Sequence, residues 1–163
     1  MRLILMRHAK SSWGTASLPD HDRPLNGRGR RSAAALGDWL RARGYLPDHV
    51  LCSTALRTRE TLAGLGLDAP VDYLPSLYLA EPEALLAAVR AAHGHTVLVL
   101  AHNPGIAECA ALMTPQAPDH PRFSDYPTGA TLVIDLPAQG WAALRPGTGM
   151  AKDFIVPRDL TEG

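Results

Sequence analysis

Two histidines that each follow a short apolar run are the residues of this chain whose types and positions best indicate chemistry. The runs Leu3–Met6 and Val97–Leu100 have the length and unbroken apolar character of buried parallel strands, and they lead toward His8 and His102. Because open α/β sheets bind ligands beyond the carboxyl ends of their strands, we expect the two rings to meet over one pocket. An imidazole is neutral and nucleophilic near pH 7, so this placement favours nucleophilic chemistry at a ring nitrogen.

Cationic side chains near these histidines narrow the chemistry further. Arg7 directly precedes His8, and Arg57 falls in the first turns of a helix that we expect after an intervening strand. Guanidinium groups offer paired N–H donors to phosphate oxygens, and a protonated His102 with the helix amides near Asn103 would add positive charge. The set predicts phosphoryl transfer, with His8 as the in-line nucleophile and the other groups as ligands of the phosphoryl oxygens.

The nucleophilic role places a condition on the ring of His8. Its attacking nitrogen must be unprotonated, so an acceptor must hold the proton of the other nitrogen. We expect this acceptor among the backbone carbonyls around Ser11–Gly14, in the loop after the first strand. A phosphohistidine intermediate would then form, and water would remove the phosphoryl group.

Composition and charge argue against several classes of protein. The formal net charge is zero, so no global field attracts nucleic acid or an anionic membrane, and we expect neither as a partner. The two cysteines, Cys52 and Cys109, are too few for a disulfide framework and lack the spacing of metal ligands. The first residues lack a signal-type apolar core, and no apolar stretch approaches the roughly 20 residues that span a bilayer. We therefore expect one cytoplasmic domain over residues 1–163, with neither metal nor cofactor.

Hydrophobic periodicity and capping residues predict the elements that would position the site. Besides the first strand, we expect strands over His49–Cys52, Val71–Leu74 and Thr96–Leu100. Helices are expected over Asn26–Arg43, Ala55–Ala63, from Pro82 to near Gly94, and over Pro104–Met113. A proline-rich loop over Thr114–Gly129 should precede a closing hairpin of Thr131–Leu136 and Trp141–Leu144, joined by 137–140.

The order of these elements predicts the fold class. Strands that alternate with helices imply right-handed crossovers, a mainly parallel sheet and helices on both of its faces. The hairpin would add an antiparallel edge. The expected fold class is therefore α/β.

The chain resembles the histidine phosphatase superfamily, which is phosphoglycerate mutase-like, and in particular its short phosphohistidine phosphatase branch. The segments that carry the resemblance are LMRHAKS, DRPLNGRGRRSA, STALRTRET and AHNPG. In that family the Arg-His pair supplies a phosphate ligand and the nucleophile, which match Arg7 and His8. The second family arginine matches Arg57, the late strand-end histidine matches His102, and the glycine that often follows Arg-His is Ala9 here. The resemblance implies a three-layer α/β/α sandwich and a metal-independent phosphatase.

One departure from the family bears on the substrate. Many members carry an acidic proton donor after the weak middle strand, whereas Leu74–Ala80 holds no carboxylate and the first one is Glu81. An alkoxide leaving group needs that proton, while a phosphorylated imidazole can protonate on its free ring nitrogen and leave unaided. The expected substrate is therefore phosphohistidine on a protein of the histidine-phosphotransfer type.

Two other functions remain as alternatives. The protein would be a small-molecule phosphomonoesterase or mutase of the same superfamily if another carboxylate supplies the proton, for which the candidates are Asp20, Asp22, Glu81 and Glu83. It would be a phosphoprotein-binding domain if the pocket binds without turnover. Lys10 and Arg23 could line the rim of the pocket, although the sequence favours a surface role for each.

Overall fold

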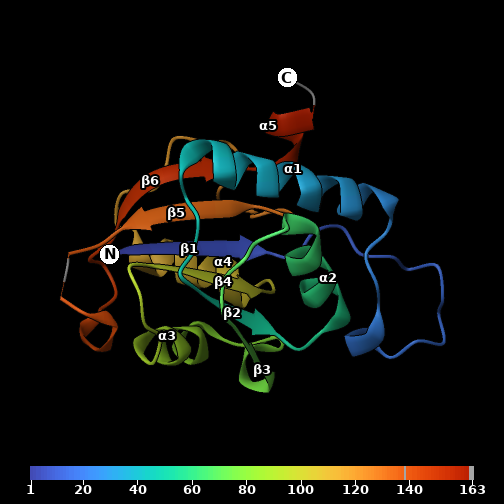
Figure 1. Cartoon of the computed structure of the whole chain (residues 1–163), viewed down its shortest axis with the longest axis horizontal. Coiled ribbons are helices and arrows are strands. Elements are labelled where there is room, and N and C mark those ends of the chain that lie inside the picture. Colours follow the sequence, from blue (N-terminus) through green and yellow to red (C-terminus); the bar gives the residue numbers. More distant parts are fainter. Residues whose placement is uncertain (138, 162–163) are drawn as a thin grey trace.

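A single six-stranded sheet organises the computed structural model, which describes residues 1–137 and 139–161 (Figure 1). Its strands are β1 (Arg2–Arg7), β2 (His49–Ser53), β3 (Val71–Leu74), β4 (Thr96–Ala101), β5 (Thr131–Asp135) and β6 (Met150–Ile155). They lie side by side in the order β3-β2-β4-β1-β5-β6. Strands β1 to β4 pair in parallel, whereas β5 is antiparallel to β1 and β6 is antiparallel to β5. The expected mainly parallel sheet with an antiparallel edge is confirmed.

Helices cover both faces of this sheet (Figure 1). The α-helices are α1 (Gly27–Arg43), α2 (Leu56–Leu65), α3 (Pro82–Arg90), α4 (Gly105–Met113) and α5 (Pro157–Thr161), and the short 3-10 helices are η1 (Asp20–Asp22), η2 (Pro75–Leu77) and η3 (Trp141–Ala143). Leu3 and Leu5 pack in one core with α3 and α4, and Ile4 and Met6 pack in the other with α1 and α2. Because both faces are covered, β1 has no polar face. The three-layer α/β/α architecture is confirmed.

Local signals in the sequence account for both ends of α1. The side chain of Asn26 accepts a hydrogen bond from the backbone N–H of Gly29 at 2.8 Å, which caps the first turn. The helix ends where Gly44 adopts a left-handed conformation with φ of 72°. The other predicted helices and parallel strands are also present, with ends that differ from the predicted ones by a few residues.

The prediction that Trp141–Leu144 forms the second strand of a hairpin is wrong. β5 pairs with β6, whereas Trp141 begins the 3-10 helix η3 instead of a strand. The Trp141 ring is buried in the core, and its Nε1–H donates to the Gly94 carbonyl at 2.7 Å. The indole places its apolar rings in the core and its single polar atom on a carbonyl, which is typical of a buried tryptophan. This packing holds Trp141 in the core, outside the β5–β6 ladder. The predicted connection 137–140 includes residue 138, which lies outside the described residues.

Two further sequence-based expectations concern the cysteines and the membrane. Cys52 and Cys109 are both buried free thiols, as expected for a chain without a disulfide framework. Within residues 1–137 and 139–161, each helix is too short or too polar to cross a lipid bilayer.

The first turn of α1 packs directly against the segment that follows β1. A Cβ added to Gly29 would lie 2.1 Å from the carbonyl oxygen of Lys10, a distance at which the backbone would have to move. A Cβ added to Gly27 would meet only the ends of two arginine side chains, the nearer at 3.4 Å. Glycine at position 29 is therefore needed for the approach of α1 to the loop behind His8.

We expect Gly29→Ala to lower the free energy of unfolding by about 1–3 kcal/mol or more, because the added methyl group displaces backbone. Gly27→Ala, in the same turn, is the matched control and should leave stability unchanged or slightly higher. Urea denaturation of both variants measures the difference. Equal midpoints for the two variants would contradict the close packing at Gly29.

Candidate active site

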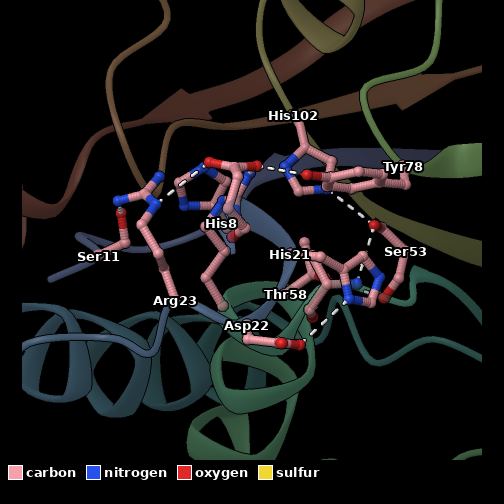
Figure 2. Close-up of polar contacts among 12 residues, drawn as sticks. His8, Ser11, His21, Asp22, Arg23, Ser53, Thr58, Tyr78 and His102 are labelled. Atoms are coloured by element: carbon pink, nitrogen blue, oxygen red, sulfur yellow. Dashed lines mark hydrogen bonds and ion pairs between the residues drawn. The ribbon is translucent and has the colours of Figure 1, made fainter. Parts of the chain in front are cut away.

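The five residues singled out from the sequence lie around one pocket at the carboxyl ends of the parallel strands. His8 follows β1, His102 follows β4, and the two ring centroids are 5.3 Å apart (Figure 2). Arg57 reaches the pocket from the first turn of α2. Arg7 directly precedes His8, and Asn103 directly follows His102. The pocket has a volume of about 180 Å³, which suits a phosphoryl group and part of its leaving group.

A backbone hydrogen bond fixes the protonation of the His8 ring. Nδ1 lies 2.7 Å from the carbonyl oxygen of Ala9. Because a carbonyl can only accept, Nδ1 carries the proton and Nε2 keeps its lone pair. Ala9 is held in turn by Thr61 of α2, whose hydroxyl accepts from the Ala9 N–H at 3.0 Å. The expectation of an acceptor within Ser11–Gly14 is wrong, because the chain turns so sharply after β1 that the next carbonyl already reaches the ring.

Burial beside cations keeps both histidine rings neutral. Burial lowers the pKa of His8 to about 3 against the opposing effect of the hydrogen bond to Ala9, and the proximity of His102, Arg7 and Arg57 contributes in the same direction as burial. Burial and the charge of Arg57 likewise lower the pKa of His102 to about 3. The expectation that His102 is protonated is therefore wrong for the pocket without a ligand. Burial and the nearby arginines, which would attract an anion, both disfavour a positive charge on the ring.

Several buried polar atoms of this pocket have no hydrogen-bond partner. Within the described residues, five buried side-chain atoms lack a hydrogen-bond partner. Four belong to the pocket, namely Arg7 Nε, Arg57 Nε, His102 Nδ1 and Asn103 Oδ1, and the fifth is Trp39 Nε1 in the α1–α2 core. Leaving a buried donor unpaired costs about 1–3 kcal/mol, so such atoms are rare in folded proteins. Both guanidinium Nε–H groups are donors on permanently charged side chains, so a negatively charged acceptor would satisfy them best.

A carboxylate anchors Arg57 from the other side. Asp20 Oδ2 accepts from Arg57 Nη2 at 3.0 Å and from the Tyr78 hydroxyl, and Asp20 Oδ1 accepts from Arg23 Nε at 3.1 Å. The backbone carbonyl of Asp20 also accepts from Arg57 Nη1 at 2.8 Å. These bonds, that of Tyr78 first, lower the pKa of the Asp20 carboxyl to about 2. Asp20 therefore stays ionised and is poorly suited to donate a proton to a leaving group.

The other candidate proton donors lie outside the pocket. Its lining consists of described residues and includes none of the four carboxylates considered from the sequence. Asp22 lies 3.7 Å from Nδ1 of His21, and Glu81 and Glu83 lie at the start of α3. The sequence-based expectation that the usual general acid is missing agrees with this arrangement.

Arg23 and Tyr78 are parts of the site that the sequence reasoning undervalued. Arg23 is only 8% exposed and lines the pocket, where its Nη1 donates to the Ser11 hydroxyl at 3.0 Å (Figure 2). The favoured surface role for Arg23 is therefore wrong, and its place in the DRPLN segment was the available signal. Tyr78 has its ring edge-on to His102 with centroids 5.5 Å apart, and no sequence pattern had pointed to it. Lys10 is exposed and lies on the rim, as expected.

Asn103 and Ser53 act on the site through hydrogen bonds that the sequence did not predict. Asn103 does not cap α4, which begins at Gly105 without a side-chain cap, and its Nδ2 instead donates to the Tyr126 carbonyl at 2.9 Å. Ser53, at the end of β2, lies with its hydroxyl 2.7 Å from His102 Nε2 and accepts from the Ala55 N–H at 3.3 Å. Each side chain thus ties one wall of the pocket to a neighbouring segment.

We expect the rings of His8 and His102 to stay neutral down to about pH 5, since both pKa values are about 3. Long-range ¹H–¹⁵N NMR spectra would measure this and should show the Nδ1–H tautomer for His8. The free energy of unfolding should fall as pH drops below about 6.5, because the unfolded chain binds protons that the folded rings exclude. The urea-unfolded protein is the control, in which both rings should titrate near 6.5. Folded-state titration of either ring near pH 6.5 would contradict the site as described.

Comparison with known proteins identifies the family. Residues 3–78 match the histidine phosphatase superfamily (branch 1). An uncharacterised protein of Mycobacterium tuberculosis is 39% identical over 160 residues, which cover 94% of this chain and 100% of that protein. An uncharacterised protein of Mycobacterium leprae is 37% identical over 162 residues, with coverage of 94% and 100%.

Solved structures agree with this relationship. A candidate phosphohistidine phosphatase SixA from Nakamurella multipartitia has a TM-score of 0.83 and 35% identity, with 96% of this chain and 95% of that chain covered. The protein histidine phosphatase SixA, solved with tungstate, has a TM-score of 0.80 and 25% identity, with coverage of 99% and 100%. These comparisons support a phosphatase, and the chain belongs to the histidine phosphatase superfamily.

Proposed function

We propose that this protein is a cytoplasmic, metal-independent phosphatase that removes phosphoryl groups from histidine residues of other proteins, with residues 1–163 as a single histidine phosphatase domain. The observation that carries the proposal is the His8 ring, whose Nδ1 donates to Ala9 and whose Nε2 is left nucleophilic beside unpartnered guanidinium donors. The phosphorylated partner would be of the histidine-phosphotransfer type, as the similarity to SixA proteins supports.

In the first step Nε2 of His8 attacks the phosphorus atom. The new N–P bond forms as the N–P bond to the substrate imidazole breaks, and the bonding electrons leave with the substrate ring. Arg7 and Arg57 stabilise the charge on the transferring oxygens through donors that lack protein partners. The leaving imidazole needs little help, because it can already carry a proton on its other nitrogen near neutral pH.

His102 contributes to this step as a neutral donor. With the Ser53 hydroxyl donating to Nε2, the proton of the neutral ring resides on Nδ1, which has no protein partner. That N–H can bond to a phosphoryl oxygen without the ring being charged. An incoming phosphate dianion would also raise the pKa of His102, because its charge opposes that of Arg57.

In the second step water attacks the phosphoryl group on His8. The N–P bond breaks, Nε2 recovers its lone pair, and the phosphate leaves with both protons of the water. The other ring proton stays on Nδ1, hydrogen-bonded to the Ala9 carbonyl, throughout. The pocket lining provides no carboxylate to protonate an alkoxide, and Asp20 next to it has a pKa of about 2. This lack supports phosphohistidine over phosphomonoesters as the substrate.

We expect Arg57→Ala to reduce turnover on the order of a thousandfold, because the guanidinium stabilises charge on the transferring group. Arg59→Ala is the matched control, since Arg59 lies on the same helix but is exposed and donates to the Thr54 carbonyl outside the pocket. Steady-state hydrolysis of phosphoramidate measures both variants. Near-normal turnover by Arg57→Ala would refute the assignment of this arginine to the phosphoryl group.

A phosphorylated histidine-phosphotransfer domain should lose its phosphate far faster than a phosphosugar, because only the imidazole can leave without an enzymic acid. Phosphate release from both substrates is compared at equal concentration. Alkaline quenching should capture acid-labile phosphate on the wild type and none on His8→Ala. A preference for the phosphosugar would indicate the small-molecule alternative, and binding without release or labelling would indicate a phosphoprotein-binding domain.

A further inference from the structure

A second, larger groove adjoins the pocket that contains His8. It has a volume of about 460 Å³, against about 180 Å³ for the pocket, and the two share Arg7, Lys10 and Thr128 in their linings. The groove is formed by the loop after β1, the start of α1, the segment that precedes β5, and α5. The groove and the pocket therefore adjoin along these three residues.

The groove concentrates positive charge in a protein whose formal net charge is zero. Its lining carries a single carboxylate, that of Asp125, and five cations, which are Arg7, Lys10, Arg28, Arg122 and Arg158. The Asp125 carboxylate is bonded to Arg122 Nη2 at 3.0 Å, so it is already engaged and does not pair with Lys10 or Arg28. Lys10 and Arg28 are exposed, and neither side chain has an ion pair or hydrogen bond within the described part of the chain.

The distribution of these cations over several segments of the chain indicates the kind of anion that the groove would bind. They come from four separate segments of the chain, with Lys10 after β1, Arg28 on α1, Arg122 before β5 and Arg158 on α5. Because they line different walls of the groove, a run of carboxylates along an extended peptide could contact more of them than a single phosphate could. Exposed cations also bind such a peptide at little desolvation cost, and they steer it toward the site.

We propose that this groove docks an acidic segment of the phosphorylated protein, next to the phosphohistidine that enters the pocket. This inference rests on the proposed function, and it adds a specificity for acidic flanking sequence. Docking holds the substrate and takes no part in phosphoryl transfer, so its effect falls on KM and depends on salt.

Two synthetic phosphohistidine peptides test the proposal, one flanked by glutamates on both sides and the other by glutamines at the same positions. The wild type should hydrolyse the glutamate peptide with a kcat/KM about tenfold higher, through KM. Arg28→Glu should abolish this preference and leave hydrolysis of phosphoramidate unchanged. Arg31→Glu, an equal charge change at an exposed position of α1 outside the groove lining, should retain the preference.

The remaining results would contradict either the docking role of the groove or the proposed function. Equal kcat/KM for the two peptides in the wild type, with phosphoramidate still hydrolysed, would overturn the docking role and leave the proposed function in place. Loss of the preference in Arg31→Glu as well would attribute it to overall charge, which also overturns the groove. A failure to hydrolyse phosphoramidate and both peptides would overturn the proposed function and this inference with it.

Discussion

The hydrogen bond from His8 Nδ1 to the carbonyl of Ala9 is the contact on which the chemistry of the site depends. It selects one tautomer of a neutral ring and thereby presents a lone pair at Nε2 toward the guanidinium groups. The bond requires that the backbone after β1 turn at once, and Thr61 of α2 holds that turn by accepting from the Ala9 N–H. A packing contact between a strand end and a helix thus decides the electronic state of the proposed nucleophile.

The second constraint is the cost of gathering cations in a buried place. Arg57 is 3% exposed and lies near two rings whose pKa values it lowers. Asp20 offsets part of this cost by accepting two hydrogen bonds from the Arg57 guanidinium, one through its backbone and one through its carboxylate. The Nε atoms of Arg7 and Arg57 remain unpartnered, which leaves the pocket electrostatically incomplete without an anion. The same arrangement that lowers the stability of the protein suits the site to the phosphoryl group of the proposed function.

The positions of the main site residues could be predicted because each follows from a local pattern. The two apolar runs lie in neighbouring parallel strands that end at the same edge of the sheet, so His8 and His102, which follow them, lie close together. Arg23 and Tyr78 had no such pattern. Arg23 belongs to a loop without periodicity, and its burial arises only when that loop folds back onto the segment after β1, where Leu25 pairs with Ser11. The outer partner of β5 was also hidden, since Trp141–Leu144 and Met150–Ile155 both contain apolar residues. The structure places Met150–Ile155 in the ladder, whereas the Trp141 indole donates to the Gly94 carbonyl.

By itself the sequence determined the α/β architecture, the strand ends that converge, and the imidazole and guanidinium groups that meet there, because periodicity and chain order are properties of the chain. The tertiary structure decided the protonation of those groups. Which carbonyl holds His8 depends on the turn after β1 that packs against Thr61 of α2. Whether His102 is charged and whether Asp20 can give up a proton depend on burial and on partners distant in sequence. Protonation is set by the local dielectric and by neighbouring charges, and both exist only once the chain has packed.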